Sequence, residues 1–273
     1  MKENDEKYIK ECQELMLYLL KYIHDLCFTH GIKYTLEAGT LLGAVRDKGF
    51  ISWDDDADIS LVREEYDKLI EVLKKEKLPK DIGIYFPEDK DEFFDFNVRL
   101  YHKKVIREDK DSIELYDGIF SHPTLDIYVM DHYPEDSFKR RMFVLKQQII
   151  FGLAMSKRKK ITIKKYGFIE KIAIFILSKI GKLFSMKSIC AMHERASKEY
   201  LSSDAKFLYG TGWIPEYPGF FYEKGLYENV HLTSFEGIEL LVLDEYDKVL
   251  TIGYGDWKVP KKTHDHVTIV TDL

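Results

Sequence analysis

The chain is short of cysteine and proline and has no long apolar run, and each shortage excludes a class of protein. Its 273 residues include three cysteines and seven prolines, too few for a disulfide-built scaffold or a proline-rich disordered chain. The N-terminus opens on charged residues, and the longest uncharged apolar stretch falls short of the ~18 residues that span a bilayer. We therefore expect no signal peptide and no transmembrane helix, and the 45% of hydrophobic residues indicates an ordinary folded protein.

The cysteines are poorly placed for a disulfide. Cys12 and Cys27 fall on one predicted helix, which separates them by roughly 22 Å. Free thiols of this kind fit a reducing compartment, so we expect the protein in the cytoplasm.

Acidic residues are nearly missing from residues 138–190, which hold 14 Lys or Arg and one acid, Glu170. Because the whole chain carries a net charge of −6, the remainder is acidic and this segment is a separate cationic unit. Three interpretations stay open: a solvated helical face, attraction to a polyanionic glycan, and peripheral contact with an anionic membrane. The stretch from Ile172 to Leu177 is apolar on all sides, which suits burial or interfacial insertion. We expect no nucleic-acid partner, because no recognised binding module accompanies the charge.

Hydrophobic periodicity predicts an α+β fold in which a mixed-sheet core carries an appended helical portion. Helices are expected over residues 5–30, 40–46, 63–77, 137–155, 167–184, 187–201 and 244–255. Strands are expected over residues 32–37, 56–62, 82–86, 93–101, 104–108 and 125–130, with a later loop over 209–222 and a hairpin that turns at Glu236-Gly237. We divide the chain into a catalytic core over 1–136, the cationic helical segment over 137–205, and a C-terminal hairpin and helix over 206–273 that completes the active site.

An acidic run at residues 51–58, Ile-Ser-Trp-Asp-Asp-Asp-Ala-Asp, is the strongest chemical signal. Side chains alternate along an extended segment, so Asp54, Asp56 and Asp58 point one way, with consecutive ones roughly 7 Å apart. Oxygen ligands of this kind suit Mg²⁺ or Mn²⁺. An EF-hand calcium loop is excluded because Ile59 stands where that loop needs glycine. A glycosyltransferase with an Asp-x-Asp metal site stays an alternative.

A Gly39-Thr40 step precedes the acidic run and is typical of a phosphate-binding turn. The Gly39 backbone can approach a phosphate closely, a helix capped by Thr40 offers unpaired N–H groups, and Arg46 can neutralise charge. Arg46 could instead be a surface residue at the end of that helix. Phosphoryl transfer requires mainly alignment of the reactants and cations that absorb charge, so these parts predict that reaction class.

A further carboxylate is expected from a neighbouring strand. Leu125, Ile127 and Val129 form an apolar face, which places Asp126 on the opposite side of its strand. We interpret Asp126 as a metal ligand or as the general base for an incoming hydroxyl, with a turn or cap acid as the alternative. Arg99 either reaches the donor phosphates from the sheet or forms a structural ion pair.

Residues 34–46, YTLEAGTLLGAVR, and 49–59, GFISWDDDADI, closely resemble the signature of the LicD family. That family belongs to the superfamily of nucleotidyltransferases shaped like DNA polymerase beta. The resemblance implies a nucleotidyltransferase core that contacts phosphates at Gly39 and Thr40. It also implies a metal-binding acidic pair, Asp56 and Asp58, with Asp126 as the third carboxylate, and it leaves Asp54 as an outer residue.

The resemblance extends sparsely to the C-terminal part, through Phe235-Glu236-Gly237 and the family's Tyr-Gly-Asp motif at 254–257. There are two departures: Ser52 stands where the family commonly has proline, and the usual proline near 243–244 is missing. Both positions affect loop rigidity more than chemistry.

Aromatic residues invite a choline-cage hypothesis, because aromatic faces hold quaternary ammonium groups. The residues concerned are Trp53, Trp213, Trp257 and neighbouring tyrosines such as Tyr254, and core packing is the default alternative. Asp256 is either a substrate contact or a cap residue.

The resemblance implies transfer of a phospho-alcohol, with phosphocholine first, from a CDP-linked donor to a hydroxyl of a cell-surface glycan precursor. The acceptor would be a lipopolysaccharide or teichoic acid precursor, met at the inner face of the membrane. Besides the glycosyltransferase named above, the alternative is a nucleotidyltransferase that leaves the nucleotide on its acceptor.

Overall fold

A computed structural model describes residues 3–106, 118, 121–161, 167–201, 204–212 and 221–259. Its helices are α1 (Glu3–Thr29), α2 (Ala38–Arg46), α3 (Arg63–Lys75), α5 (Ser137–Ala154), α6 (Phe168–Gly181), α7 (Met186–Ser197) and α8 (Tyr246–Tyr254). Its strands are β1 (Thr35–Leu36), β2 (Ala57–Val62), β3 (Ile82–Tyr85), β4 (Val98–His102), β5 (Thr124–Tyr133), β6 (Phe207–Gly210), β7 (Phe221–Glu223), β8 (Val230–Phe235) and β9 (Ile238–Leu243). Short 3₁₀ turns are η1 (Pro87–Asp89), η3 (Met155–Lys157), η4 (Lys198–Tyr200) and η5 (Lys224–Tyr227).

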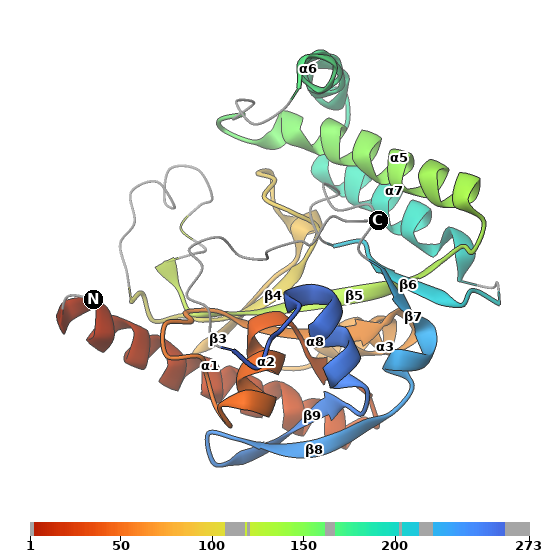
Figure 1. Cartoon of the computed structure of the whole chain (residues 1–273). Helices are drawn as coiled ribbons and strands as arrows, with labels where there is room; N and C mark the ends of the chain where they lie inside the picture. The colour runs from red at the N-terminus through yellow and green to blue at the C-terminus, as the bar shows by residue number, and fades with distance from the viewer. Residues whose placement is uncertain are drawn as a thin grey trace.

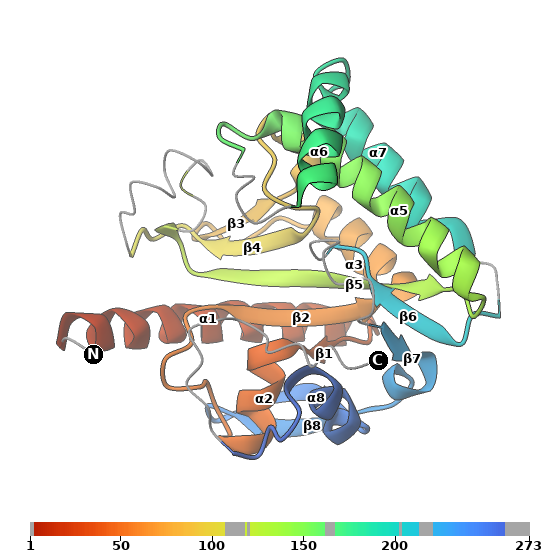
Figure 2. The same cartoon turned by 45° about the horizontal axis from the view of Figure 1, so that its top comes forward.

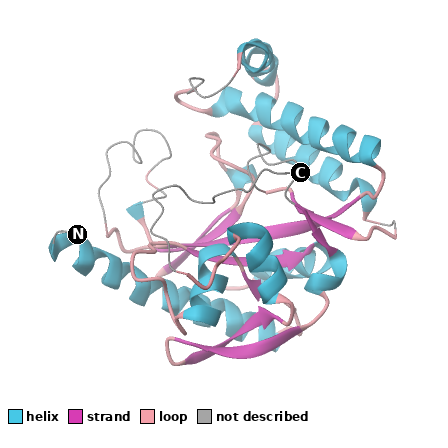
Figure 3. Cartoon of the chain, viewed as in Figure 1, coloured by secondary structure: helices cyan, strands magenta, loops and turns pink. Residues whose placement is uncertain are grey.

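The core is a seven-stranded mixed sheet in the order β1-β2-β5-β4-β3, with β6 beside the far end of β5 and β7 beside β6. Strands β2 and β5 run parallel, and the other neighbours are antiparallel. This arrangement confirms the predicted α+β class with a mixed sheet (Figure 3).

Helix α1 covers one face of the sheet (Figure 2). Its apolar residues recur at helical spacing and are buried: Cys12, Met16, Leu19, Leu20, Ile23 and Cys27. This row packs in the main hydrophobic core, and the helix gives way to Gly31, whose φ of +63° suits glycine.

Helices α5, α6 and α7 form a separate layer at one end of the molecule (Figure 1). They enclose a second hydrophobic cluster, in which Phe93 and Ile189 are fully buried. Phe93 comes from the loop before β4, so this loop joins the helical layer to the sheet.

A buried ionic group makes a second link between sheet and helices. Arg63, at the start of α3, pairs with Asp131 of β5 at 2.6 and 2.8 Å and with Glu194 of α7 at 3.1 Å. The Thr211 hydroxyl donates to Asp131 as well. The helical layer is therefore anchored to the centre of the sheet by charge as well as by packing.

The hairpin β8–β9 turns at Glu236-Gly237, as predicted, with φ values of 47° and 80°. The Glu236 carboxylate accepts from the Phe50 N–H at 3.2 Å, and its own N–H donates to the Lys48 carbonyl. A side chain at Gly49 would collide with Glu236. The Phe-Glu-Gly motif thus fastens the hairpin to the loop ahead of the acidic run.

Several predicted boundaries were wrong. The predicted strand 93–101 is observed as β4, which begins later, at Val98, and ends at His102. Of the predicted strand 104–108, residues 104–106 are not a strand, and 107–108 lie outside the described residues. Strands β6 and β7 fall at and beyond the ends of the predicted loop 209–222, where turn-forming residues and aromatics hid the short extended runs. No helix among the described residues is long and apolar enough to span a membrane.

Candidate active site

The sheet register builds the centre of the site. Parallel pairing of β2 with β5 sets Asp58 opposite Asp126, and antiparallel pairing of β4 with β5 sets Arg99 opposite the same Asp126. At the other side, the Glu37 N–H donates to the Asp58 carbonyl at 3.0 Å. Neighbouring strands lie about 4.8 Å apart, so Arg99, Asp126 and Asp58 form one polar row across the sheet. We call Asp58 and Asp126 the carboxylate row, and together with Asp54 and Asp56 they form the acidic cluster.

Asp126 is held by Arg99 and keeps one oxygen unpaired. Arg99 is buried, binds Asp95 through two bonds of 2.8 and 2.6 Å, and donates to Asp126 Oδ2 at 2.8 Å. Burial raises the pKa of Asp126 to about 6, and Arg99 limits the rise. Within the part of the chain that the structure describes, Asp126 Oδ1 is buried and has no hydrogen-bond partner.

Asp58, the other carboxylate of the row, is buried. Burial, followed by the charges of Asp56 and Asp126, raises its pKa well above the ordinary value. No lysine or arginine pairs with it within the described part of the chain.

Asp54 lies in the same cluster. Burial raises its pKa to about 8, and the charge of Asp56 and a hydrogen bond between the two side chains add to the rise. Asp54 is therefore mostly protonated at neutral pH. The outer position that the resemblance implies for Asp54 stays a prediction.

These carboxylates fit a divalent cation by their chemistry. The set consists of oxygen donors only, and among the described residues Asp126 Oδ1 has no hydrogen-bond partner and Asp58 has no paired cation. Among the described residues, no group of three or more His, Cys, Asp or Glu side chains already converges as a metal cage.

Helix α2 begins beside this cluster. A Cβ placed on Gly39 would lie 2.7 Å from Asp54 Oδ2, so a side chain at this position would force the Asp54 carboxylate to shift. Ala38, just before it, has φ of +47°, a strained conformation for alanine. The first N–H groups of a helix are left unpaired by the helix itself, and here they start next to the carboxylates.

The predicted cap was wrong. The N-cap of α2 is Glu37, and Thr40 lies one turn into the helix. The Thr40 hydroxyl instead accepts from the Asp58 N–H at 2.9 Å, which ties α2 to the start of β2.

Two residues that the sequence did not point to complete the wall of the site. Glu37 is buried and accepts from the Ser60 hydroxyl at 2.5 Å and the Tyr227 hydroxyl at 3.1 Å, and burial raises its pKa. Tyr128 donates to Asp126 Oδ2 at 3.5 Å. The available sequence signal was their position, since Glu37 stands two residues before Gly39 and Tyr128 stands two residues after Asp126.

Comparison with known proteins agrees with this geometry. Residues 31–157 match the family described as LicD/FKTN/FKRP, nucleotidyltransferase domain. The matched range contains α2, β2, β4 and β5, and therefore the whole carboxylate row. These residues form a LicD-family domain.

The relatives include one of matching length. The chain is 29% identical over 264 residues, 92% of each protein, to the lipopolysaccharide cholinephosphotransferase LicD of Haemophilus influenzae. It is 32% identical over 145 residues to an uncharacterised protein of Rickettsia typhi, covering 51% of this chain and 40% of that protein. A stretch of 73 residues is 45% identical to an uncharacterised protein of Rickettsia prowazekii. The chain is thus similar along nearly its whole length to a LicD protein, and residues 31–157 carry the family's nucleotidyltransferase domain.

The LicD-family domain does not bring Arg46 to the glycine step. Arg46 stands at the opposite end of α2, about 10 Å along the axis from Gly39. It binds Asp47 at 2.9 and 2.7 Å and touches the Trp257 carbonyl at 3.5 Å. In this structure it joins α2 to the C-terminal motif.

The C-terminal Tyr-Gly-Asp-Trp motif divides between site and core. Burial raises the pKa of Tyr254, and the charges of Asp58, Glu37 and Asp54 add to it, so Tyr254 faces the acidic cluster. Trp257 is buried in the main core against Tyr246, and Asp256 is exposed.

Of the other aromatic candidates, Trp53 is half-buried and packs on the main core, and Trp213 lies outside the described residues. Core packing is therefore what the structure shows for Trp53 and Trp257.

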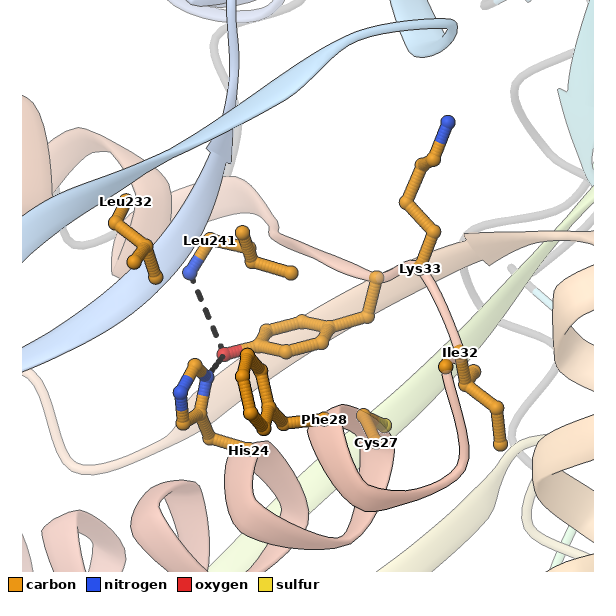
Figure 4. A pocket seen from close by; sticks show the side chains of 9 residues that line it. His24, Cys27, Phe28, Ile32, Lys33, Leu232 and Leu241 are labelled. Atoms are coloured by element: carbon orange, nitrogen blue, oxygen red, sulfur yellow. Dashed lines mark hydrogen bonds between the residues drawn. The ribbon is translucent and has the colours of Figure 1, made fainter.

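A pocket of 290 Å³ lies elsewhere on the protein, between the end of α1 and the hairpin (Figure 4). Its walls include His24, Phe28, Leu232 and Leu241, and its polar contact is the Tyr34 hydroxyl, bonded to His24 at 2.8 Å. It contains none of the predicted site residues, so the carboxylate row remains the candidate active site.

Proposed function

We propose that this protein transfers phosphocholine from a CDP-linked donor to a hydroxyl of a cell-surface glycan precursor, with a lipopolysaccharide precursor as the first candidate. We place the reaction in the cytoplasm. The observation that carries the proposal is the register of β2 and β5, which sets Asp58 beside Asp126 next to the start of α2. The lipopolysaccharide cholinephosphotransferase of Haemophilus influenzae, similar over 92% of both chains, supports the choice of phosphocholine and acceptor.

The residues divide the chemistry between donor and acceptor. The N–H groups at Gly39 and Thr40 would hold the donor's phosphates at the helix start. Asp126 would accept the acceptor's proton, because with a pKa of about 6 it is mostly ionised at neutral pH. The bond from phosphorus to the CMP oxygen breaks as the bond from phosphorus to the acceptor oxygen forms, and CMP leaves.

Mg²⁺ or Mn²⁺ is part of the proposal. Asp56, Asp58 and Asp126 would hold the ion, which when bound supplies positive charge to the donor's phosphates and to the crowded carboxylates. Arg99 keeps Asp126 in one orientation, so that its unpaired oxygen faces the site.

The test is a donor screen with purified protein in Mg²⁺. CDP-choline, CDP-ribitol, CDP-glycerol and CDP-ethanolamine are compared by the rise they cause in the thermal midpoint. CDP-choline is expected to give the largest rise, and its effect should vanish with EDTA and in Asp58→Asn. A larger rise with another donor would reassign the transferred alcohol.

Product analysis separates the two reactions that this site supports. Phosphocholine transfer releases CMP and adds the mass of phosphocholine to the acceptor. Release of pyrophosphate from a nucleoside triphosphate, with a nucleotide left on the acceptor, would overturn the proposal in favour of nucleotidyl transfer.

A further inference from the structure

Helix α6 has two apolar faces. One face packs on α5: a Cβ on Gly181 would collide with the Leu153 carbonyl, and Leu177 lies against Gly152. The opposite face is open to solvent, with exposed fractions of 78% for Phe168, 81% for Ile169, 46% for Ile172, 64% for Phe175, 50% for Ile176 and 43% for Ile180. An ordinary surface helix keeps polar residues on its outer face, so this composition needs a partner.

The exposed apolar surface continues along α5. Its open residues, at helical spacing, are Phe138, Met142, Leu145 and Ile149. The next residue in this stripe is Gly152, on which α6 packs. The stripe and α6 therefore lie on one side of α5, and Figure 1 shows α6 at the outer edge of the molecule, on the far side of α5 from the sheet.

Lysines accompany the exposed apolar residues of α6. Lys171, Lys179 and Lys182 belong to α6 or follow it directly, and none of them forms an ion pair with a carboxylate among the described residues. The segment 138–190 as a whole holds 14 basic residues and one acid. Long cationic side chains beside exposed apolar ones match a surface with phosphate outside and hydrocarbon within.

We propose that α6, with the adjoining stripe of α5, docks on a bilayer that contains anionic phospholipid. The apolar side chains enter the boundary between headgroups and acyl chains, and the lysines lie among the phosphates. A symmetric dimer through this face would bring two cationic surfaces together, which opposes that alternative.

The inference is independent of the proposed reaction. Docking depends on the outer face of α6 and is measured without a donor, whereas the reaction depends on the carboxylate row. Failure of one leaves the other standing.

The experiment is sedimentation of the full chain with vesicles of phosphatidylcholine, with and without one fifth phosphatidylglycerol. The protein is expected to pellet with the anionic vesicles at 50 mM salt. It should bind neutral vesicles at least about tenfold more weakly, because each lysine near an anionic surface adds to the affinity. Raising the salt should release much of it, since the Debye length shortens.

Substitutions on the outer face of α6 test whether this surface binds the vesicles. The pair Phe168→Ser and Ile169→Ser is expected to weaken anionic-vesicle binding by about tenfold or more. Phe28, 79% exposed on α1, provides the matched control, and Phe28→Ser should bind as the parent does. The set Lys171→Glu, Lys179→Glu and Lys182→Glu should weaken binding and flatten its dependence on salt. Circular dichroism checks that each variant is folded.

Three results would overturn the proposal. They are no binding to anionic vesicles at low salt, equal binding to neutral vesicles, and unchanged binding of the Phe168→Ser, Ile169→Ser variant. A parent that sediments as a dimer while this variant is monomeric would show that a second copy covers the face instead.

Discussion

Asp58 is the side chain of the site on which burial and the charges of three neighbouring carboxylates act together. It is buried, and its neighbours Asp56, Asp126 and Asp54 are acidic, with no cation paired to it in the described part of the chain. Asp58→Asn should therefore nearly abolish CMP release and leave the thermal midpoint in EDTA equal or higher, because the substitution removes like-charge repulsion.

Asp55 gives the matched control, since it belongs to the same run but its side chain is exposed. Asp55→Asn should keep most of the turnover. Substantial turnover in Asp58→Asn, or a fall in its midpoint of several degrees, would contradict the assigned role.

Gly39 is predicted to act through Asp54. Alanine normally stabilises a helix relative to glycine by about 0.5–1 kcal/mol. Here its Cβ would lie 2.7 Å from Asp54 Oδ2, so Gly39→Ala should lower the thermal midpoint and weaken donor binding. In an Asp54→Ala background the same change should no longer be destabilising, and a double-mutant cycle measures this coupling. Additive effects would mean that the two residues do not interact.

Single residues also show where sequence reasoning stops. Spacing along a strand located Asp58 and Asp126, because strand alternation fixes the side to which each points. The sequence did not show that Arg46 lies at the far end of α2 or that the Thr40 hydroxyl accepts from the Asp58 N–H, because both depend on how α2 packs; phosphate binding by these residues stays a prediction. Glu37 and Tyr128 depend on long-range partners that no local pattern reports.

Among the elements, α1 and the pair β2 and β5 were predictable because burial imposes a regular apolar period on them. Strands β6 and β7 were missed because they are short, lie at the edge and flank an aromatic loop. Their pairing with β5 is a tertiary contact that has no counterpart in local sequence.

The junction between α3, β5 and α7 depends on Asp131. Arg63 and Asp131 are both about 1% exposed, so Asp131→Ala leaves a buried guanidinium without its main partner. We expect a loss of about 3–5 kcal/mol in the free energy of unfolding, measured in urea.

Asp67 contacts the same arginine from a position that is 35% exposed, so Asp67→Asn should cost under about 1 kcal/mol. Similar losses in the two variants would show that the buried pair is not the anchor.

Helix α7 carries a pH-sensitive residue. His193 is buried, stacks on Phe96 at 3.9 Å and donates from Nε2 to the Thr211 carbonyl at 3.0 Å. Burial lowers its pKa from 6.5 to about 4, with Arg63 lowering it and Asp131 and Glu194 opposing. The unfolded chain therefore binds the proton first, and stability falls as the pH drops from about 6.5 towards 4.

The loss of free energy of unfolding that protonation of His193 causes is on the order of 3 kcal/mol once the pH is below about 4. His193→Gln keeps a donor but cannot titrate, so its free energy of unfolding should fall less between pH 7 and pH 5 than that of the parent. An equal fall in both proteins would assign the pH dependence to other groups.

At the scale of the whole molecule, the helical layer and the sheet should unfold together. The three tryptophans, at 53, 213 and 257, all lie outside the segment 137–201, whereas that segment supplies much of the helix signal. Because Arg63 and Phe93 join the two parts, thermal melts followed by tryptophan fluorescence and by circular dichroism should coincide. Earlier loss of the helix signal would show that the layer melts independently.

The loop over residues 93–97 has a consequence for exchanging parts between relatives. Phe93 belongs to the core of the helical layer, and two residues later Asp95 holds the arginine that orients Asp126. A chimaera that takes residues 137–201 from another family member must therefore take 93–97 with them. A junction placed at the apparent boundary between sheet and helices would divide one inherited unit, and the reaction centre would lose its alignment even though every catalytic carboxylate was retained.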